Sequence, residues 1–221
     1  MKEGCKIIDL NMVNVFLLKG KNGFVLIDTG MGQHWERLES ELISAGCLPD
    51  QLKLVVVTHG DFDHTGNCAR LQEKYGTKIA MHQADSFIVE NGMIEKREIR
   101  TLMGKLIMIL AKWKYRKATF DKFKPDVYLE DGQNLESYGF DGKIIHLPGH
   151  TKGSIGILTP ESDLFIGDTL TNMRKPDLSP FIDNYEELTK SLERLKKLNI
   201  KMVYPGHGKP FSGDNISKIS I

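Results

Sequence analysis

Residues 52–64, LKLVVVTHGDFDH, place four polar side chains directly after a short apolar run. The run LKLVVV is unbroken and rich in β-branched residues, which is typical of a buried β-strand. After it, His59, Asp61, Asp63 and His64 fall within six residues. A loop at a strand end can turn such side chains towards one point, and imidazole and carboxylate groups both suit a divalent first-row metal. The stretch therefore predicts a metal site, the alternative being a solvated loop of aspartates and histidines.

Three later segments repeat this arrangement. In each, an expected strand ends, a glycine lies beside a single histidine or aspartate, and the chain turns. The segments are Pro148-Gly149-His150-Thr151, Gly167-Asp168-Thr169 and Pro205-Gly206-His207-Gly208. Glycine permits the tight backbone that directs a neighbouring side chain inward. Four ligand-bearing strand ends in one chain favour a shared metal centre over four unrelated turns.

Strands and helices alternate along most of the 221 residues, and no low-complexity linker separates two halves. Apolar runs and helical spacing predict the elements. Strands are expected at 12–18, 23–28, 52–57, 78–81, 143–146, 154–158, 163–166 and 201–204, and helices at 35–43, 68–75 and 185–198. This alternation is typical of the α/β class, so we expect a single domain over residues 1–221.

Residues 84–124 depart from the alternation, and their apolar residues predict a helical insertion that caps the domain. Residues 96–124 hold ten basic and two acidic residues, a formal charge of +8 against −7 for the rest of the chain. Such a segment could bind an anionic, partly apolar substrate, lie on an anionic membrane surface or form a dimer interface. The alternative is an amphipathic helix that packs its apolar face on the domain and leaves its lysines in solvent.

Composition limits the classes of protein. Hydrophobic residues make up 40% and charged residues 27%, which is typical of a globular chain. A net charge of +1 argues against a surface built to bind nucleic acid. Three widely spaced cysteines argue against a disulfide framework and favour a reducing, cytoplasmic compartment. No signal peptide is expected, because residues 1–9 carry both charge signs before any apolar run. No membrane-spanning run is expected, because the longest apolar stretch, near residues 102–111, is short and interrupted.

The four strand ends resemble those of the metallo-β-lactamase-fold hydrolases, and the resemblance extends from Asp28-Thr29-Gly30 to His207. It implies an αβ/βα four-layer sandwich with two divalent metal ions at one edge. The residues implied to bind them are His59, Asp61 and His150 for the first ion, Asp63, His64 and His207 for the second, and Asp168 between the two.

One position departs from the family pattern. The family's first motif reads His-x-His-x-Asp-His, so Asp61 stands where the second histidine is usual. A carboxylate hardens the first site and favours iron or manganese relative to an all-nitrogen site. The related flavodiiron proteins carry a carboxylate at the equivalent place and use iron. Zinc is our first expectation and iron or manganese the alternatives; a further alternative is that Asp61 does not bind metal and the site holds one ion.

The resemblance implies a hydrolase that cleaves a small-molecule ester, thioester or lactone with hydroxide generated at the dinuclear site. Asp63 or Asp168 would hold the hydroxide and pass its proton to the leaving group. The alternatives are a non-haem iron oxidoreductase acting on dioxygen or a sulfur compound, a phosphodiesterase-type hydrolase, and a metal-stabilised binding module without activity.

Several polar residues near the motifs receive supporting or structural roles. The threonines beside the expected ligands could orient them, and His146 could do the same through a hydrogen bond. His34 and His82 are expected to be surface or structural residues. Cys68 is expected to be a small buried residue at a helix start rather than a nucleophile. The threonines are Thr58, Thr65 and Thr151.

Overall fold

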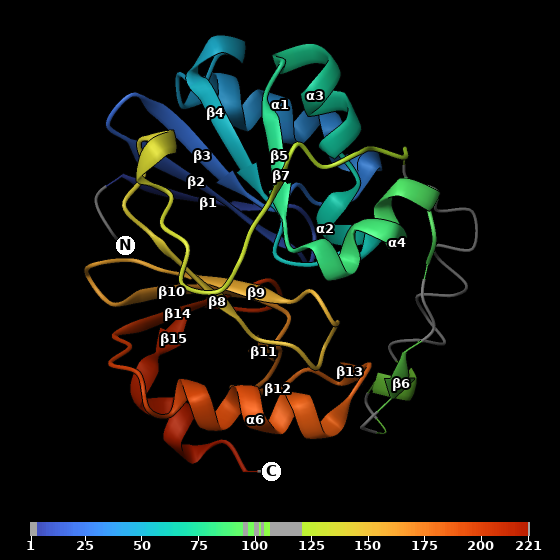
Figure 1. The fold of residues 1–221 in the computed structure, drawn as a ribbon, viewed down its shortest axis with the longest axis vertical. Helices are drawn as coiled ribbons and strands as arrows, with labels where there is room; N and C mark the ends of the chain where they lie inside the picture. The colour runs from blue at the N-terminus through green and yellow to red at the C-terminus, as the bar shows by residue number, and fades with distance from the viewer. Residues whose placement is uncertain (1–3, 95–96, 100–101, 103, 107–120, 221) are drawn as a thin grey trace.

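The computed structural model describes residues 4–94, 97–99, 102, 104–106 and 121–220. Two β-sheets pack face to face, and helices cover the outer face of each (Figure 1). Helices α1 (Trp35–Ser44) and α3 (Cys68–Tyr75) lie on one side, and α6 (Tyr185–Leu195) lies on the other. This is the expected four-layer αβ/βα sandwich.

The first sheet has the strand order β1-β2-β3-β4-β5-β7. Its strands are β1 (Cys5–Asp9), β2 (Asn14–Gly20), β3 (Gly23–Ile27), β4 (Leu52–Val56), β5 (Lys78–Met81) and β7 (Val127–Tyr128). The first three strands are antiparallel, whereas β3, β4, β5 and β7 run parallel. The carboxyl ends of these four strands therefore meet at one edge.

The second sheet has the order β15-β14-β10-β9-β8. Its strands are β8 (Lys143–His146), β9 (Ile155–Leu158), β10 (Asp163–Gly167), β14 (Met202–Pro205) and β15 (Phe211–Ser212). Strands β10 and β14 are parallel, and their register shifts between Phe165 and Gly167, just before Asp168. Their carboxyl ends thus lie side by side.

Three apolar clusters hold the four layers together. The first packs α1 and α3 on one face of the first sheet, and the second fills the space between the sheets. The third packs α6 on the outer face of the second sheet. Alternate strand residues supply opposite faces, so that Leu26 joins the first cluster and Val25 and Ile27 join the second.

Short elements complete the described chain. The helices are α2 (Phe62–Thr65) and α4 (Ser86–Asn91), with 3₁₀ turns at Gly32–His34, Pro49–Gln51, Gln83–Asp85, Glu136–Tyr138 and Gly213–Lys218. Two small antiparallel ladders join β11 (Leu170–Thr171) to β12 (Asp177–Leu178) and β6 (Glu98–Ile99) to β13 (Phe181–Ile182).

The expectation of a helical segment over residues 84–124 is wrong in part. Helix α4 and residues 104–106 are helical, but Glu98–Ile99 forms a strand and residues 121–124 are irregular. The strand forms because β13 offers an unpaired edge, and such a tertiary partner overrides local preference. Residues 95–96, 100–101, 103 and 107–120, which carry much of the expected basic charge, lie outside the described residues.

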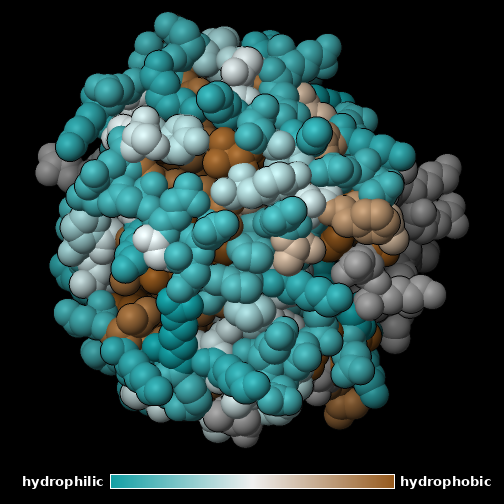
Figure 2. Space-filling view, in the orientation of Figure 1, coloured by the Kyte–Doolittle hydropathy of each residue, from teal (hydrophilic) through white to brown (hydrophobic). Residues whose placement is uncertain are grey.

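Figure 2 shows a mainly hydrophilic face, with an apolar patch beside α4. Within the described residues, no helix has the length and apolar character needed to cross a membrane.

Candidate metal centre

The seven residues expected to bind metal come together at the edge where the strands of both sheets end. His59, Asp61, Asp63 and His64 follow β4, and His150 follows β8. Asp168 follows β10, and His207 follows β14. The backbone amide of Gly206 donates to the carbonyl oxygen of Gly167 at 2.8 Å, which ties the last two strand ends together.

The first expected trio converges on one oxygen of Asp61. Its Oδ2 lies 3.5 Å from Nε2 of His59 and 3.2 Å from Nε2 of His150. Two donor atoms that each lie about 2.0–2.2 Å from a tetrahedral metal are about 3.3–3.6 Å apart. The spacing of the trio therefore fits a shared divalent ion.

The second expected trio and Asp168 show similar spacings. Nε2 of His207 lies 3.4 Å from Oδ2 of Asp63 and 3.1 Å from Oδ2 of Asp168. The other oxygen of Asp168, Oδ1, lies 3.5 Å from Nε2 of His64, and Oδ2 lies 4.0 Å from Nε2 of His150. Asp168 thus faces both trios, and each trio has candidate ligand atoms within 4.8 Å of one another.

Buried ligand atoms without hydrogen bonds support this fit. Nε2 of His59, His64 and His150 and Oδ1 of Asp168 are buried, and none has a hydrogen-bond partner. Leaving such groups unsatisfied costs about 1–3 kcal/mol each. Four of them directed into one space fit a centre completed by cations.

The other ring nitrogen of each histidine is held by an acceptor. Nδ1 of His150 donates to the carbonyl of Phe181 at 2.7 Å, and Nδ1 of His207 donates to that of Met12 at 2.6 Å. A nitrogen facing a carbonyl must carry the proton, which leaves Nε2 with the lone pair that a metal needs.

Asp28 and Thr58 perform the same task for the histidines of the first motif. Asp28 accepts from Nδ1 of His64 at 2.8 Å and from the amide and hydroxyl of Thr58. Because that hydroxyl donates to Asp28, its oxygen can accept from Nδ1 of His59, 2.9 Å away. Thr58 therefore orients a ligand as expected. The role of Asp28 was not anticipated, although its position in the Asp-Thr-Gly strand end was noticed.

Asp85 was also missed by the sequence reasoning. Its carboxylate is 1% exposed and accepts from the amide of Gly60 at 2.9 Å and from that of Gly153 at 2.7 Å. These amides belong to the loops that carry His59 and His150. Asp85 therefore holds the two loops in register, although it lies outside both motifs.

Arg97 is the third residue that was missed. Its guanidinium donates through Nε to Oδ2 of Asp61 at 3.1 Å and through Nη2 to Oδ1 of the same carboxylate. Its Nη1 donates to Asp183 Oδ1 at 2.5 Å and to the carbonyl of His150 at 3.1 Å. Arg97, which belongs to the expected insertion, therefore contacts two of the segments that carry candidate ligands, at Asp61 and at His150.

The site favours bound cations. Burial opposes ionisation of Asp61, but Arg97 and the neighbouring histidines outweigh it and hold the pKa of Asp61 well below its usual value. Burial likewise disfavours the charged form of His64, yet the surrounding carboxylates raise its pKa to about 9. The pKa of His207 lies well above its usual value, because Asp168 and Asp63 outweigh its burial. Carboxylates that hold protons on neighbouring imidazoles would equally stabilise metal ions in their place.

Two glycines leave the space that these side chains occupy. A Cβ on Gly206 would lie 2.5 Å from Oδ1 of Asp168 and 2.6 Å from Cε1 of His64. Gly167 has a φ of +54°, and a Cβ there would lie 2.4 Å from Oγ1 of Thr58. Only glycine fits without displacing a candidate ligand or Thr58.

The remaining polar residues have structural contacts. The hydroxyl of Thr65 donates to the carbonyl of Asp61, whereas that of Thr151 bonds to Ser154. His146 bonds to the carbonyl of Lys152 rather than to a ligand, and its ring stacks on His82 at 4.0 Å. Cys68 begins α3 and is fully buried, as expected.

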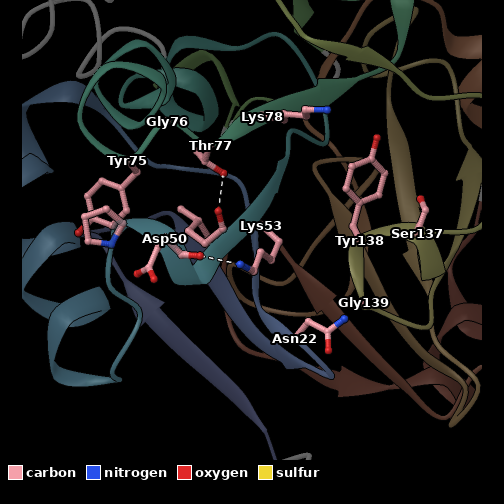
Figure 3. A pocket seen from close by; sticks show the side chains of 12 residues that line it. Asn22, Asp50, Lys53, Tyr75, Gly76, Thr77, Lys78, Ser137, Tyr138 and Gly139 are labelled. Atoms are coloured by element: carbon pink, nitrogen blue, oxygen red, sulfur yellow. Dashed lines mark hydrogen bonds between the residues drawn. The ribbon is translucent and has the colours of Figure 1, made fainter.

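A cleft of about 600 Å³ lies at the opposite, amino end of β4 and β5 (Figure 3). Lys53 in this cleft donates to the backbone carbonyl of Asp50, and the hydroxyl of Thr77 donates to that of Leu52. These polar groups are satisfied by the cleft's own wall. We therefore assign no function to this cleft.

Comparisons with known proteins agree with the architecture. A sequence profile described as the metallo-beta-lactamase superfamily matches residues 8–207. The human acyl-coenzyme A thioesterase MBLAC2 is 26% identical over an alignment of 227 positions, which includes 95% of this chain and 78% of that protein. The hydroxyacylglutathione hydrolase GloC of Haemophilus influenzae is 30% identical over 164 residues, 71% of this chain and 69% of its own length.

Solved structures share the fold. A metallo-beta-lactamase family protein of Thermus thermophilus, TTHA1429, superposes with a TM-score of 0.73 at 23% identity over 97% of this chain and 77% of its own. TTHA1623, solved in a di-iron-bound form, has a TM-score of 0.70 at 25% identity and covers 97% of this chain and 96% of its own. The expected fold and hydrolase class are thus confirmed. With a profile match over nearly its whole length and four strand ends converging on one edge, this chain belongs to the metallo-β-lactamase superfamily.

Proposed function

We propose that this protein is a metal-dependent hydrolase that cleaves small-molecule thioesters, with esters and lactones as related substrates. The observation that carries the proposal is the set of unpaired, buried ligand atoms that four strand ends direct into one space. The two relatives named as thioester hydrolases support the substrate class.

The proposed centre holds two divalent ions. The residues that would bind them are His59, Asp61 and His150 for one ion, Asp63, His64 and His207 for the other, and Asp168 for both. When bound, such ions lower the pKa of water towards neutrality, polarise a carbonyl oxygen and stabilise the charge that develops on it. No serine or cysteine nucleophile is required.

The structure favours Asp63 over Asp168 as the group that accepts and returns a proton. The side chain of Asp63 is 20% exposed and that of Asp168 only 7%. Both oxygens of Asp168 face histidine nitrogens, so this carboxylate has little freedom to contact a substrate. Burial opposes the charge on Asp63, but His64 and His207 lower its pKa, so it is ionised near neutral pH. It can therefore take up a proton there and pass it to a thiol leaving group.

We propose that exposed apolar side chains of α4 and the segment after it receive the acyl group. Helix α4 begins directly after Asp85, whose carboxylate binds both metal-site loops. Phe87, in the first turn of this helix, is 64% exposed, and Ile94 beyond its end is also exposed. The apolar patch beside α4 in Figure 2 is where the acyl part of a thioester would rest.

Zinc remains the first metal that we propose, with iron or manganese as alternatives. Asp61 favours a harder ion than a third histidine would. The di-iron form of TTHA1623 supports the capacity of this fold for iron. A non-haem iron oxidoreductase is therefore the second candidate function.

Purified protein, with its metals identified first, should be assayed on acyl thioesters of coenzyme A and glutathione, lactones, phosphodiesters and β-lactams. The proposal expects two metal ions per chain and thiol release from a thioester, lost in Asp168→Asn. The exposed carboxylate of Glu193 supplies the control variant Glu193→Gln, which should keep full activity. Iron together with oxygen consumption and no hydrolysis would instead support the oxidoreductase, and turnover confined to phosphodiesters would replace the substrate class.

A further inference from the structure

Arg97 binds the one carboxylate that departs from the family motif. Its Nε and Nη2 contact the two oxygens of Asp61 in a bidentate fork. Nη1 is held in turn by Asp183 and by the carbonyl of His150. The Arg97 side chain is only 5% exposed, so the guanidinium is fixed against the candidate centre and largely shielded from water.

The pairing of strands β6 and β13 positions the Arg97 guanidinium. Strand β6 begins directly after Arg97 and pairs with β13, with Glu98 opposite Ile182. Arg97 and Asp183 thus lie at the adjoining end of the same ladder. Strand β13 also supplies the carbonyl of Phe181 that binds Nδ1 of His150. One short strand therefore positions both a candidate ligand and the arginine beside it.

The fork leaves Asp61 with a defined orientation and a compensated charge. Oδ2 accepts from Nε of Arg97 and lies between Nε2 of His59 and Nε2 of His150. A carboxylate that accepts a bidentate guanidinium shares its negative charge with that partner. The Asp61–Arg97 pair is formally neutral, as is the histidine that usually occupies this position.

We propose that Arg97 is a positioning residue that sets the metal preference of the His59, Asp61 and His150 site. It holds Oδ2 of Asp61 between the two imidazoles, and it offsets the charge that would otherwise shift this site towards hard ions. The inference rests on the proposed metal centre. The proposal also bears on the substitution Asp61→His. That substitution alone leaves the buried Arg97 guanidinium beside the site without the carboxylate that it binds.

Metal binding to chelator-stripped protein tests the proposal without reference to activity. Zn²⁺ and Mn²⁺ affinities are measured by competition with a chromophoric chelator, for wild type and for Arg97→Gln, which is neutral and retains hydrogen bonding. We expect the preference for Zn²⁺ over Mn²⁺ to fall about tenfold or more at one of the two metal equivalents. Arg97→Lys keeps the charge but loses the bidentate fork, so its ratio should lie between those of wild type and Arg97→Gln.

A second pair of variants tests the charge balance. In Asp61→His the Arg97 guanidinium keeps its charge but loses its carboxylate partner, so this variant should bind Zn²⁺ weakly. The double variant Asp61→His/Arg97→Gln removes that charge and should bind Zn²⁺ about tenfold more tightly than Asp61→His. Arg70→Met removes an exposed arginine that is paired with Asp121 and should leave both affinities unchanged. Circular dichroism establishes that each variant is folded.

The outcomes separate two failures. If folded Arg97→Gln binds both metals with wild-type preference, or if the Asp61 and Arg97 effects simply add, Arg97 has no part in metal selection and the inference is wrong. If wild-type protein binds neither metal at micromolar concentration, the proposed centre itself fails. Should Arg97→Gln not fold, the ratio in Arg97→Lys decides: a reduced preference for Zn²⁺ supports the positioning role, and a wild-type ratio without the bidentate fork overturns it.

Discussion

Replacement of Asp85 by alanine should destabilise the protein far more than the loss of a surface carboxylate. The side chain is 1% exposed, and its two oxygens are acceptors for the amides of Gly60 and Gly153. Asp85→Ala leaves both buried donors without a partner. Each unsatisfied group costs about 1–3 kcal/mol, so the free energy of unfolding should fall by about 2–6 kcal/mol.

A graded variant checks the arithmetic. Asp85→Asn keeps the shape and one acceptor oxygen, but it turns an NH₂ group towards the second amide. We expect about half the loss, about 1–3 kcal/mol. Glu90→Ala, at the other end of α4, removes a carboxylate that, among the described residues, accepts from the exposed hydroxyl of Tyr128. It should change stability by less than about 0.5 kcal/mol.

Urea unfolding followed by circular dichroism measures these differences. The protein is first stripped with a chelator, because metal bound to the folded state would add its own stabilisation. Transitions of equal slope allow the midpoints to be compared as free energies. An Asp85→Ala protein that unfolds within about 0.5 kcal/mol of wild type would show that water replaces the carboxylate, and the account of the two loops would be refuted.

Three further outcomes are expected. Asp168→Asn should lower thioester hydrolysis more than about 100-fold and reduce the metal content, measured by elemental analysis, while the fold is kept. Gly206→Ala should weaken metal binding about 10–100-fold in a chelator competition, because its Cβ would lie 2.5 Å from Oδ1 of Asp168 and 2.6 Å from Cε1 of His64. Burial raises the pKa of the Cys47 thiol from 9.0 to about 12, and that of Cys68 also rises. The folded state therefore keeps the Cys47 proton that the unfolded state loses above pH 9, so this thiol should lower the free energy of unfolding by about 1.4 kcal/mol per pH unit between pH 9 and 11. Cys47→Ala should make the free energy of unfolding, measured with urea at each pH, fall less steeply over this range.

The sequence was most informative where structure is local. Strand β5 and helix α3 have the expected bounds. An apolar run or a helical repeat predicts the type of element, and the turn residues on either side predict where it begins and ends. The seven candidate ligands could be found because each follows an apolar strand and most lie beside a glycine. Strand β1, with the sequence CKIID, was not expected, since its apolar core is only two residues long.

What the sequence did not reveal depends on contacts between distant residues. Arg97 lies 36 positions from Asp61 and reaches it only because β6 pairs with β13. The basic residues and apolar spacing around Arg97 predicted a helix, and a two-residue strand leaves too short a pattern to detect. Asp85 likewise lies 68 positions from Gly153, and no periodicity links a buried carboxylate to an amide in another loop.

The distribution of the seven side chains along the chain affects how the protein is made. The seven residues span positions 59 to 207, so the complete set of ligand atoms first exists only after residue 207 has left the ribosome. Until then a metal ion meets only a partial set, and it would bind that set weakly. Metal bound to the complete set would slow unfolding more than it would speed folding, because contacts that form last act on the rate at which the finished molecule opens.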